Sequence, residues 1–205
     1  MPRCADYHSS HLTRAQTRTA IAANDFAETI GASLNLVLHI HWYWTAYALS
    51  DRRKTLPKLL ESQRHWLMHR NVGYYSITVR ENPSMGSLRE HAHQLVHVPV
   101  ELRRDFLTHV RDFLRQNGRC QKEALKWGEG YSIGKLAYLC KGSTAAARQL
   151  IAEQFGTYYE REKFTEATAA KKDQGLIWGK RLYISQSLGA RAQQLHCIKA
   201  SSLAA

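Results

Sequence analysis

An α+β fold around an antiparallel sheet is the fold class that the sequence predicts, on two observations. Segments that alternate apolar and polar residues, as strands do, are interleaved with segments whose apolar residues recur at helical spacing. The order of these segments along the chain is β-α-β-β-α-β, followed by further helices and a possible last strand. This order is typical of a ferredoxin-like split βαβ fold, with a central sheet of four or five strands and the helices mainly on one face.

The first predicted strand covers residues 34–42, where Leu36, Leu38 and Ile40 alternate with His39 and His41. The elements expected after it are a helix over 51–68, strands over 74–81 and 89–98, an amphipathic helix from residue 99 to 116, a strand over 124–127, helices over 132–141 and 145–154, and an edge strand within 176–185. Because the usual spatial order of such a sheet is 4-1-3-2, the strand over 89–98 is expected to be central.

A chain of 205 residues with 44% hydrophobic residues can bury one sizeable core. Residues 1–30 are polar with little periodicity, and we expect a weakly ordered N-terminal arm there. Residues 31–190 are the predicted catalytic domain, and residues 191–205 the predicted C-terminal tail.

Charge is the outlying property of the composition. The chain has 29 Lys and Arg against 17 Asp and Glu, a formal net charge of +12. Such an excess favours a polyanionic partner, nucleic acid first, although a merely soluble basic surface is the alternative reading.

The cysteines and the apolar segments exclude several classes of protein. The four cysteines are scattered without a Cys-x-x-Cys pair, unlike a disulfide framework or a zinc ribbon. The N-terminus lacks the apolar region of a signal peptide, and the longest apolar run, over 32–47, is interrupted by Asn35, His39 and His41. We therefore expect a cytoplasmic protein without a membrane span.

The segment His91-Ala92-His93 is the strongest candidate for a metal site. Residues two apart on a strand project from the same face, so the two imidazoles can share one divalent cation. Glu81 ends the preceding strand and is the expected third ligand. His39 and His41 form a competing His-x-His pair and are possible accessory residues of the same site. Histidines that merely alternate on a surface strand are the alternative.

Tyr138 is the candidate nucleophile, on the helix expected over 132–141 near the metal site. Lys141 follows three residues later and places a cation on the same helix face, which favours the phenolate. Tyr131 is the second choice. A tyrosine on such a helix is more often half-buried core, so the assignment depends on the histidines before it.

The pair His91-Ala92-His93 followed by Tyr138-Leu139-Cys140-Lys141 resembles motifs two and three of the HUH endonuclease superfamily. The order, histidines before tyrosine, is similar to that of rolling-circle replication initiators of plasmids and phages. The runs from His97 to Phe106 and from Gly179 to Gly189 also look like replication proteins of mobile elements. The resemblance spans residues 32–190.

The resemblance implies a five-stranded sheet and a Mg²⁺ or Mn²⁺ ion held by His91, His93 and a third ligand, here Glu81, which polarises the scissile phosphate of single-stranded DNA. It further implies attack by Tyr138, a 5′-phosphotyrosine link and a free 3′-hydroxyl that primes synthesis. The chain departs from the family's pattern in three places: His39 stands where the first motif usually has a small hydroxyl or polar residue, Ala92 separates the two histidines, and Glu81 lies somewhat far from His91 in sequence.

The expected partners are single-stranded DNA or an origin hairpin, with a host helicase and polymerase, and the protein is expected to be a monomer or homodimer. The cations assigned to DNA binding are Arg103, Arg104, Lys180 and Arg181, and further candidates are Arg111, Arg115, Lys122, Lys126 and the stacking residues Trp127 and Trp178. Two alternatives stay open: a single-tyrosine transposase of the same superfamily, acting as a dimer, and a non-catalytic basic nucleic-acid-binding protein.

Overall fold

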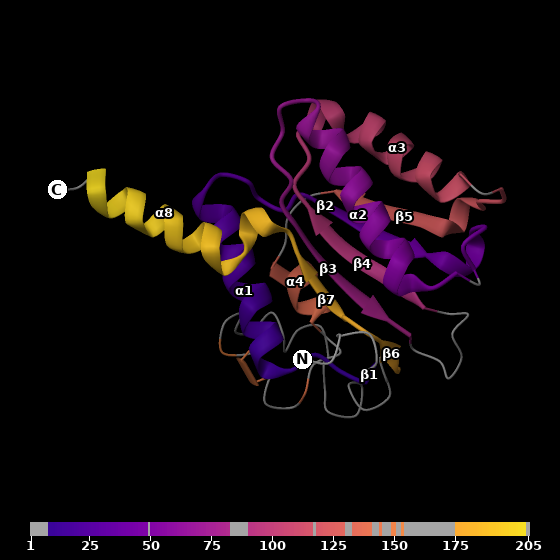
Figure 1. The fold of residues 1–205 in the computed structure, drawn as a ribbon, viewed down its shortest axis with the longest axis horizontal. Helices are drawn as coiled ribbons and strands as arrows, with labels where there is room; N and C mark the ends of the chain where they lie inside the picture. Colours follow the sequence, from indigo (N-terminus) through magenta and orange to yellow (C-terminus); the bar gives the residue numbers. More distant parts are fainter. Residues whose placement is uncertain are drawn as a thin grey trace.

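The computed structural model describes residues 8–48, 50–82, 90–116, 118–129, 133–140, 144, 149–150, 153 and 175–203. Its centre is a five-stranded antiparallel sheet with the spatial order β5-β2-β4-β3-β7 (Figure 1). These strands are β2 (Leu36–His41), β3 (Ser76–Glu81), β4 (His91–Val96), β5 (Leu125–Glu129) and β7 (Leu182–Ile184). Two short strands, β1 (His8–Ser9) and β6 (Ile177–Trp178), pair separately.

The predicted α+β class and strand order are confirmed. Among the first four strands of the main sheet in chain order, the spatial order is 4-1-3-2, and β7 adds a fifth strand beside β3. The strand of His91 and His93 is therefore central, between β2 and β3. Because β4 is flanked by strands on both sides, the polar side chains on its faces are largely buried and need hydrogen-bond partners.

Two helices cover one face of the sheet. They are α2 (Arg52–Met68) and α3 (Arg103–Arg115), which Figure 1 shows side by side in front of the strands. The even-numbered residues of β2, such as Leu38 and Ile40, point to this face and pack with Phe106 and Val110 of α3. The amphipathic pattern of α3 was the clearest helix signal in the sequence, and this apolar layer explains it.

The opposite face carries α1 (Arg14–Thr29) and α4 (Ile133–Leu139), so the expectation of helices mainly on one face is wrong. The expected weakly ordered arm over residues 1–30 is also wrong where it meets α1. Thr13 and Gln16 form a capping box that begins this helix. Its buried stripe recurs at helical spacing but consists mainly of small or polar residues: Thr17, Ala20, Ile21, Ala23, Asn24 and Ala27. Such a stripe carries little hydrophobic signal and is easily missed.

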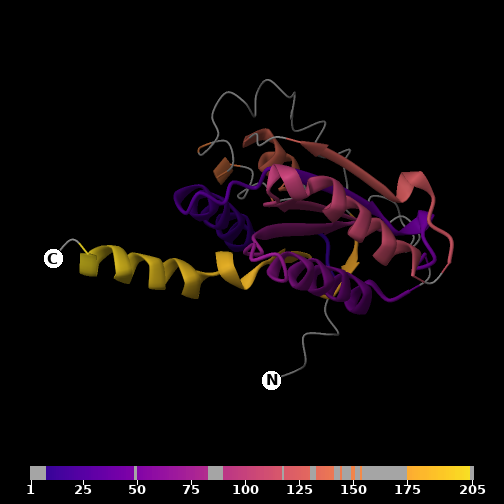
Figure 2. The ribbon, with the colours of Figure 1, turned by 90° about the horizontal axis from the view of Figure 1, so that it is seen from above.

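The C-terminal part departs from the prediction in two ways. The strand expected within 176–185 is divided into β6 and β7 at Gly179, whose φ of 76° favours glycine. The predicted tail forms α8 (Ala190–Leu203), which extends away from the sheet in both ribbon views (Figures 1 and 2). The helix predicted over 145–154 lies almost wholly outside the described residues.

Short 3-10 helices connect the main elements: η1 (Trp42–Trp44), η3 (Val100–Leu102), η4 (Lys122–Ala124) and η5 (Gln186–Leu188). None of the helices in the described ranges has both the length and the apolar character needed to cross a membrane.

Candidate metal centre

The register of the three central strands places the polar residues in cross-strand rows. On the α1 and α4 face, the first row is apolar and joins Val37, Leu95 and Ile77. The next row joins His39, His93 and Val79, and the third joins His41, His91 and Glu81. The face thus changes from apolar to polar toward one end of the sheet, and all five polar side chains lie within two adjacent rows.

Three of these side chains bring their ligand atoms together. The Nε2 atoms of His91 and His93 lie 3.0 Å apart, and the Oε2 atom of Glu81 lies 3.3 Å from the first and 3.1 Å from the second. All three side chains are largely buried. The approach of Glu81 to His91 across the β3–β4 pairing is the one expected from the sequence.

The three donors fit a divalent metal ion. Adjacent ligands of an octahedral ion with bonds of about 2.1 Å are separated by roughly 3.0 Å, close to the spacing of these atoms. Two imidazoles and one carboxylate on one side of an ion leave the remaining coordination positions open. Because imidazole nitrogen is a softer ligand than oxygen, this donor set favours Mn²⁺ over Mg²⁺.

His39 contacts Nδ1 of His93, the ring nitrogen that is not among the three metal donors. The Nδ1 atoms of the two rings lie 2.6 Å apart, and the rings meet edge to face with centroids 4.6 Å apart. One of these nitrogens must carry the proton. When Nε2 of His93 is a ligand, that proton is on Nδ1 of His93, which then donates to His39. His39 is therefore a positioning residue that orients the His93 ring.

His41 stacks on His91, with ring centroids 5.2 Å apart. Burial lowers the pKa of His41 to about 4, with smaller contributions from the charges of His91, His93 and Lys126. At neutral pH this imidazole is uncharged, so it can pack beside the metal donors without adding another positive charge.

Tyr138 lies directly beside the donors. Its ring meets His93 edge to face at a centroid distance of 5.2 Å and His39 at 6.3 Å. Leu136 and Leu139 anchor α4 in the core, whereas Tyr138 remains 37% exposed. The structure therefore brings together the predicted nucleophile of α4, the two histidines of β4 and the acid of β3, from three separate elements.

Other predicted site residues are not all placed there. Lys141 and Tyr131 lie outside the described residues. Arg181 is buried, and its guanidinium donates to the backbone carbonyls of Ser9, Gly175 and Arg80. The assignment of Arg181 to DNA binding is therefore corrected: the side chain ties β1 and β7 to β3. Lys180 is exposed and lies over the ring of Tyr183.

The arginines of α3 also require a correction. Arg104 is exposed, and Arg103 pairs with Glu129 at 3.4 Å. Both belong to the helix layer on the far face of the sheet from the histidines. They do not line the metal donors. The prediction was wrong because amphipathicity shows which side of a helix is buried but not which face of the sheet the helix covers.

Lys126 is a neighbour of the site that the sequence did not connect with it. On the edge strand β5 it pairs in register with His39, so its exposed side chain belongs to the face that carries the donors. No local signal reveals this contact, because it follows from the pairing of β5 with β2.

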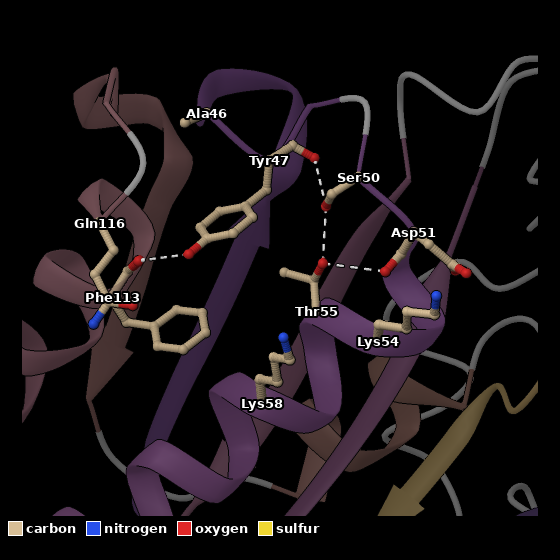
Figure 3. Close-up of a pocket in the computed structure, with 9 residues that line it drawn as sticks. All are labelled: Ala46, Tyr47, Ser50, Asp51, Lys54, Thr55, Lys58, Phe113 and Gln116. Carbon is tan, nitrogen blue, oxygen red and sulfur yellow. Dashed lines mark hydrogen bonds between the residues drawn. The ribbon is translucent and has the colours of Figure 1, made fainter.

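A cavity of about 490 Å³ lies between the start of α2 and the end of α3 (Figure 3). Lys54 and Lys58 line one side and Tyr47 and Phe113 the other, with the Tyr47 hydroxyl directed at the carbonyl of Phe113. This cavity belongs to the α2 and α3 layer, and it contains none of the metal donors.

Cys140 comes directly after the last residue of α4 and is buried in the core. Burial raises the pKa of its thiol to about 12, and the charge of Glu81 acts in the same direction. We expect iodoacetamide at pH 8 to alkylate the exposed Cys197 readily and to leave Cys140 unmodified until denaturant is added. Peptide mass spectrometry over time measures both rates. Equal rates for the two thiols in the native protein would contradict the packing of α4.

Comparisons with protein-family models, with curated proteins and with solved structures find no match to this chain. The function must therefore be inferred from the residues of the site. It consists of a buried carboxylate and two imidazoles arranged as metal ligands, with a partly exposed tyrosine against them. This arrangement indicates a metal-dependent activity.

Proposed function

We propose that this protein is a metal-dependent nicking and joining enzyme for single-stranded DNA, which initiates rolling-circle replication through a 5′-phosphotyrosine intermediate. The observation that carries the proposal is the contact of Tyr138 with His93, at a ring-centroid distance of 5.2 Å. A potential nucleophile thus lies next to three side chains placed to bind one metal ion, and it is still accessible to a substrate.

Each residue has a definite task in this proposal. His91, His93 and Glu81 would hold a Mn²⁺ or Mg²⁺ ion, which supplies electrostatic stabilisation of the charge developing on a phosphate. His39 keeps the His93 ring in the orientation required of a ligand. Tyr138 supplies the attacking oxygen, and its partial exposure lets a phosphodiester approach from solvent.

The reaction is a transesterification without an external energy source. The phenolic oxygen of Tyr138 forms a bond to phosphorus and gives up its proton to solvent, while the bond from phosphorus to the 3′ oxygen breaks. The 3′ oxygen takes up a proton and becomes a free hydroxyl. Attack of a 3′-hydroxyl on the phosphotyrosine reverses these steps and joins the strand.

The proposal is tested by incubating the protein with single-stranded DNA from its own origin in Mn²⁺ or in EDTA. The DNA is labelled at the 3′ end in one sample and at the 5′ end in another, and the products are separated on a denaturing protein gel. We expect a metal-dependent covalent band that carries only the 3′ label, since the tyrosine remains on the 5′ phosphate of the downstream fragment.

Tyr138→Phe serves as the matched variant, because it removes the nucleophilic oxygen and keeps the ring that contacts His93. We expect no covalent band and no cleavage with this variant. If the wild type binds DNA but forms no adduct under any metal condition, the proposed enzyme is wrong and a non-catalytic binding protein is favoured. An adduct that persists in Tyr138→Phe would overturn the assignment of the nucleophile. Activity restricted to a dimer would favour the transposase.

A further inference from the structure

We propose that single-stranded DNA reaches the metal donors along the edge of β5, over a strip formed by Tyr43, Trp44, Lys122 and Lys126. This inference rests on the proposed function, since it assigns the binding surface for the same substrate. It replaces the buried Arg181 and the far-side arginines of α3 as the main DNA contacts.

Two aromatic side chains lie exposed at one end of the strip. Tyr43 is 48% and Trp44 is 38% exposed, and their rings meet edge to face with centroids 4.8 Å apart. They lie in η1, two and three residues after His41, the last residue of β2. The buried ring of Trp42 anchors η1 in the core, so the backbone that presents the two exposed rings is held in place. Exposed aromatic faces of this kind stack with bases of any sequence.

Cations lie next to these rings because the chain before β5 pairs with η1. The Gln121 amide donates to the Trp44 carbonyl at 2.9 Å, and Thr45 forms an antiparallel bridge with Cys120. Lys122, exposed at the start of η4, is the residue that follows Gln121, so its backbone lies close to that of Trp44. An ammonium beside an exposed indole provides one phosphate contact and one stacking contact for the same nucleotide.

The strip continues to the metal donors through β5. Lys126 is exposed and pairs in register with His39, the residue that contacts His93. Figure 2 shows β5 along an edge of the sheet and leading toward α4, the helix of Tyr138. The nearby acid Glu129 is paired with Arg103, and Glu123 is half-buried. The edge therefore offers positive charge from η4 to the row of His39 and His93.

The strip is tested with a fluorescently labelled oligothymidine of about 12 nucleotides, within the site sizes known for single-strand-binding folds. Binding is measured by anisotropy in EDTA, so that neither metal nor cleavage contributes. We expect Trp44→Ala to raise the Kd by about tenfold, and Trp44→Phe, which keeps an aromatic face, to restore most of the affinity.

The charge contribution is tested by the double variant Lys122→Ala/Lys126→Ala. Loss of two phosphate contacts is expected to reduce the slope of log Kd against log salt concentration by about 1.4. The matched control is Arg191→Ala/Lys199→Ala, which removes the same charge from exposed positions on α8. This helix extends away from the sheet on the side opposite η4 (Figure 1), and we expect the slope to stay unchanged.

The outcomes separate this inference from the proposed function. If Trp44→Ala and the lysine double variant bind the oligonucleotide like the wild type, the strip is wrong, whether or not the wild type forms an adduct. If both weaken binding while the α8 control does not, the strip is supported, even when no adduct forms. Equal losses of affinity in the strip variants and in the α8 control would show that only net charge matters, and the proposed strip would be wrong.

Discussion

His93→Ala is expected to weaken Mn²⁺ binding by at least about 100-fold. The substitution removes one of three ligand atoms that lie 3.0–3.3 Å apart, and leaves Glu81 and His91 as the remaining donors. Even outer residues that only orient a ligand typically contribute 10–100-fold to metal affinity, so loss of a ligand must cost more. Isothermal titration calorimetry with Mn²⁺ measures the change, and far-UV circular dichroism confirms that the variant is folded.

Two further variants make this prediction specific. Glu81→Gln keeps the size of the side chain and removes the carboxylate charge, so it should also weaken Mn²⁺ binding strongly. His97→Ala is the control, since His97 lies just beyond the same strand and contacts the carbonyl of Ser33. Its effect on affinity should be less than about twofold. Wild-type affinity in both His93→Ala and Glu81→Gln would show that these residues do not form a metal site.

Glu90→Ala is expected to lower the free energy of unfolding by about 3–5 kcal/mol. Glu90 accepts a hydrogen bond of 2.7 Å from Nε of Arg80, and the Arg80 side chain is only 1% exposed. Without Glu90 the buried guanidinium keeps the neutral carbonyls of Trp178 and Lys180 as acceptors but loses its counter-charge. Urea unfolding followed by circular dichroism measures the loss.

The Arg80–Glu90 ion pair also lies next to the metal donors. Arg80 and Glu90 directly precede Glu81 and His91 in the chain, so this ion pair holds the ends of β3 and β4 together. Glu90→Gln, which keeps an acceptor for Arg80, should lose less stability than Glu90→Ala. Glu61→Ala is the control because its ion pair with Arg64 is exposed and screened by solvent, and its unfolding midpoint should not change measurably. A loss below about 1 kcal/mol in Glu90→Ala would mean that the buried pair is not formed.

The main sheet was predictable because its strands carry strong local signals. Alternation over 34–42 and the apolar stripe of the helix after Pro99 each follow from burial of one side of an element. The strand order then followed from the β-α-β-β-α-β sequence of elements, and with it the central place of His91 and His93. Glu81 could be selected as a neighbour of His91 for the same reason.

Helix α1 shows where local signals are insufficient. Its buried side is made mainly of alanine, threonine and asparagine, and such residues are equally common in polar, exposed segments. This stripe is buried only because it packs on the second face of the sheet, against Val37, Val79 and Leu95. Arg181 is the converse case: a charged residue in a basic run is expected at the surface, yet backbone carbonyls from three segments surround it.

From its sequence alone, this chain could be recognised as a basic α+β protein with His91, His93, Glu81 and Tyr138 as candidate residues of one site. Periodicity and spacing are sufficient for that, because they depend on neighbours along the chain. Which of the eleven histidines come together, that His39 contacts His93, and that Lys126 belongs to the same face were decided by the tertiary structure. These contacts join residues far apart in sequence, and their existence depends on strand register, which shifts every side chain to the other face when it slips by one residue.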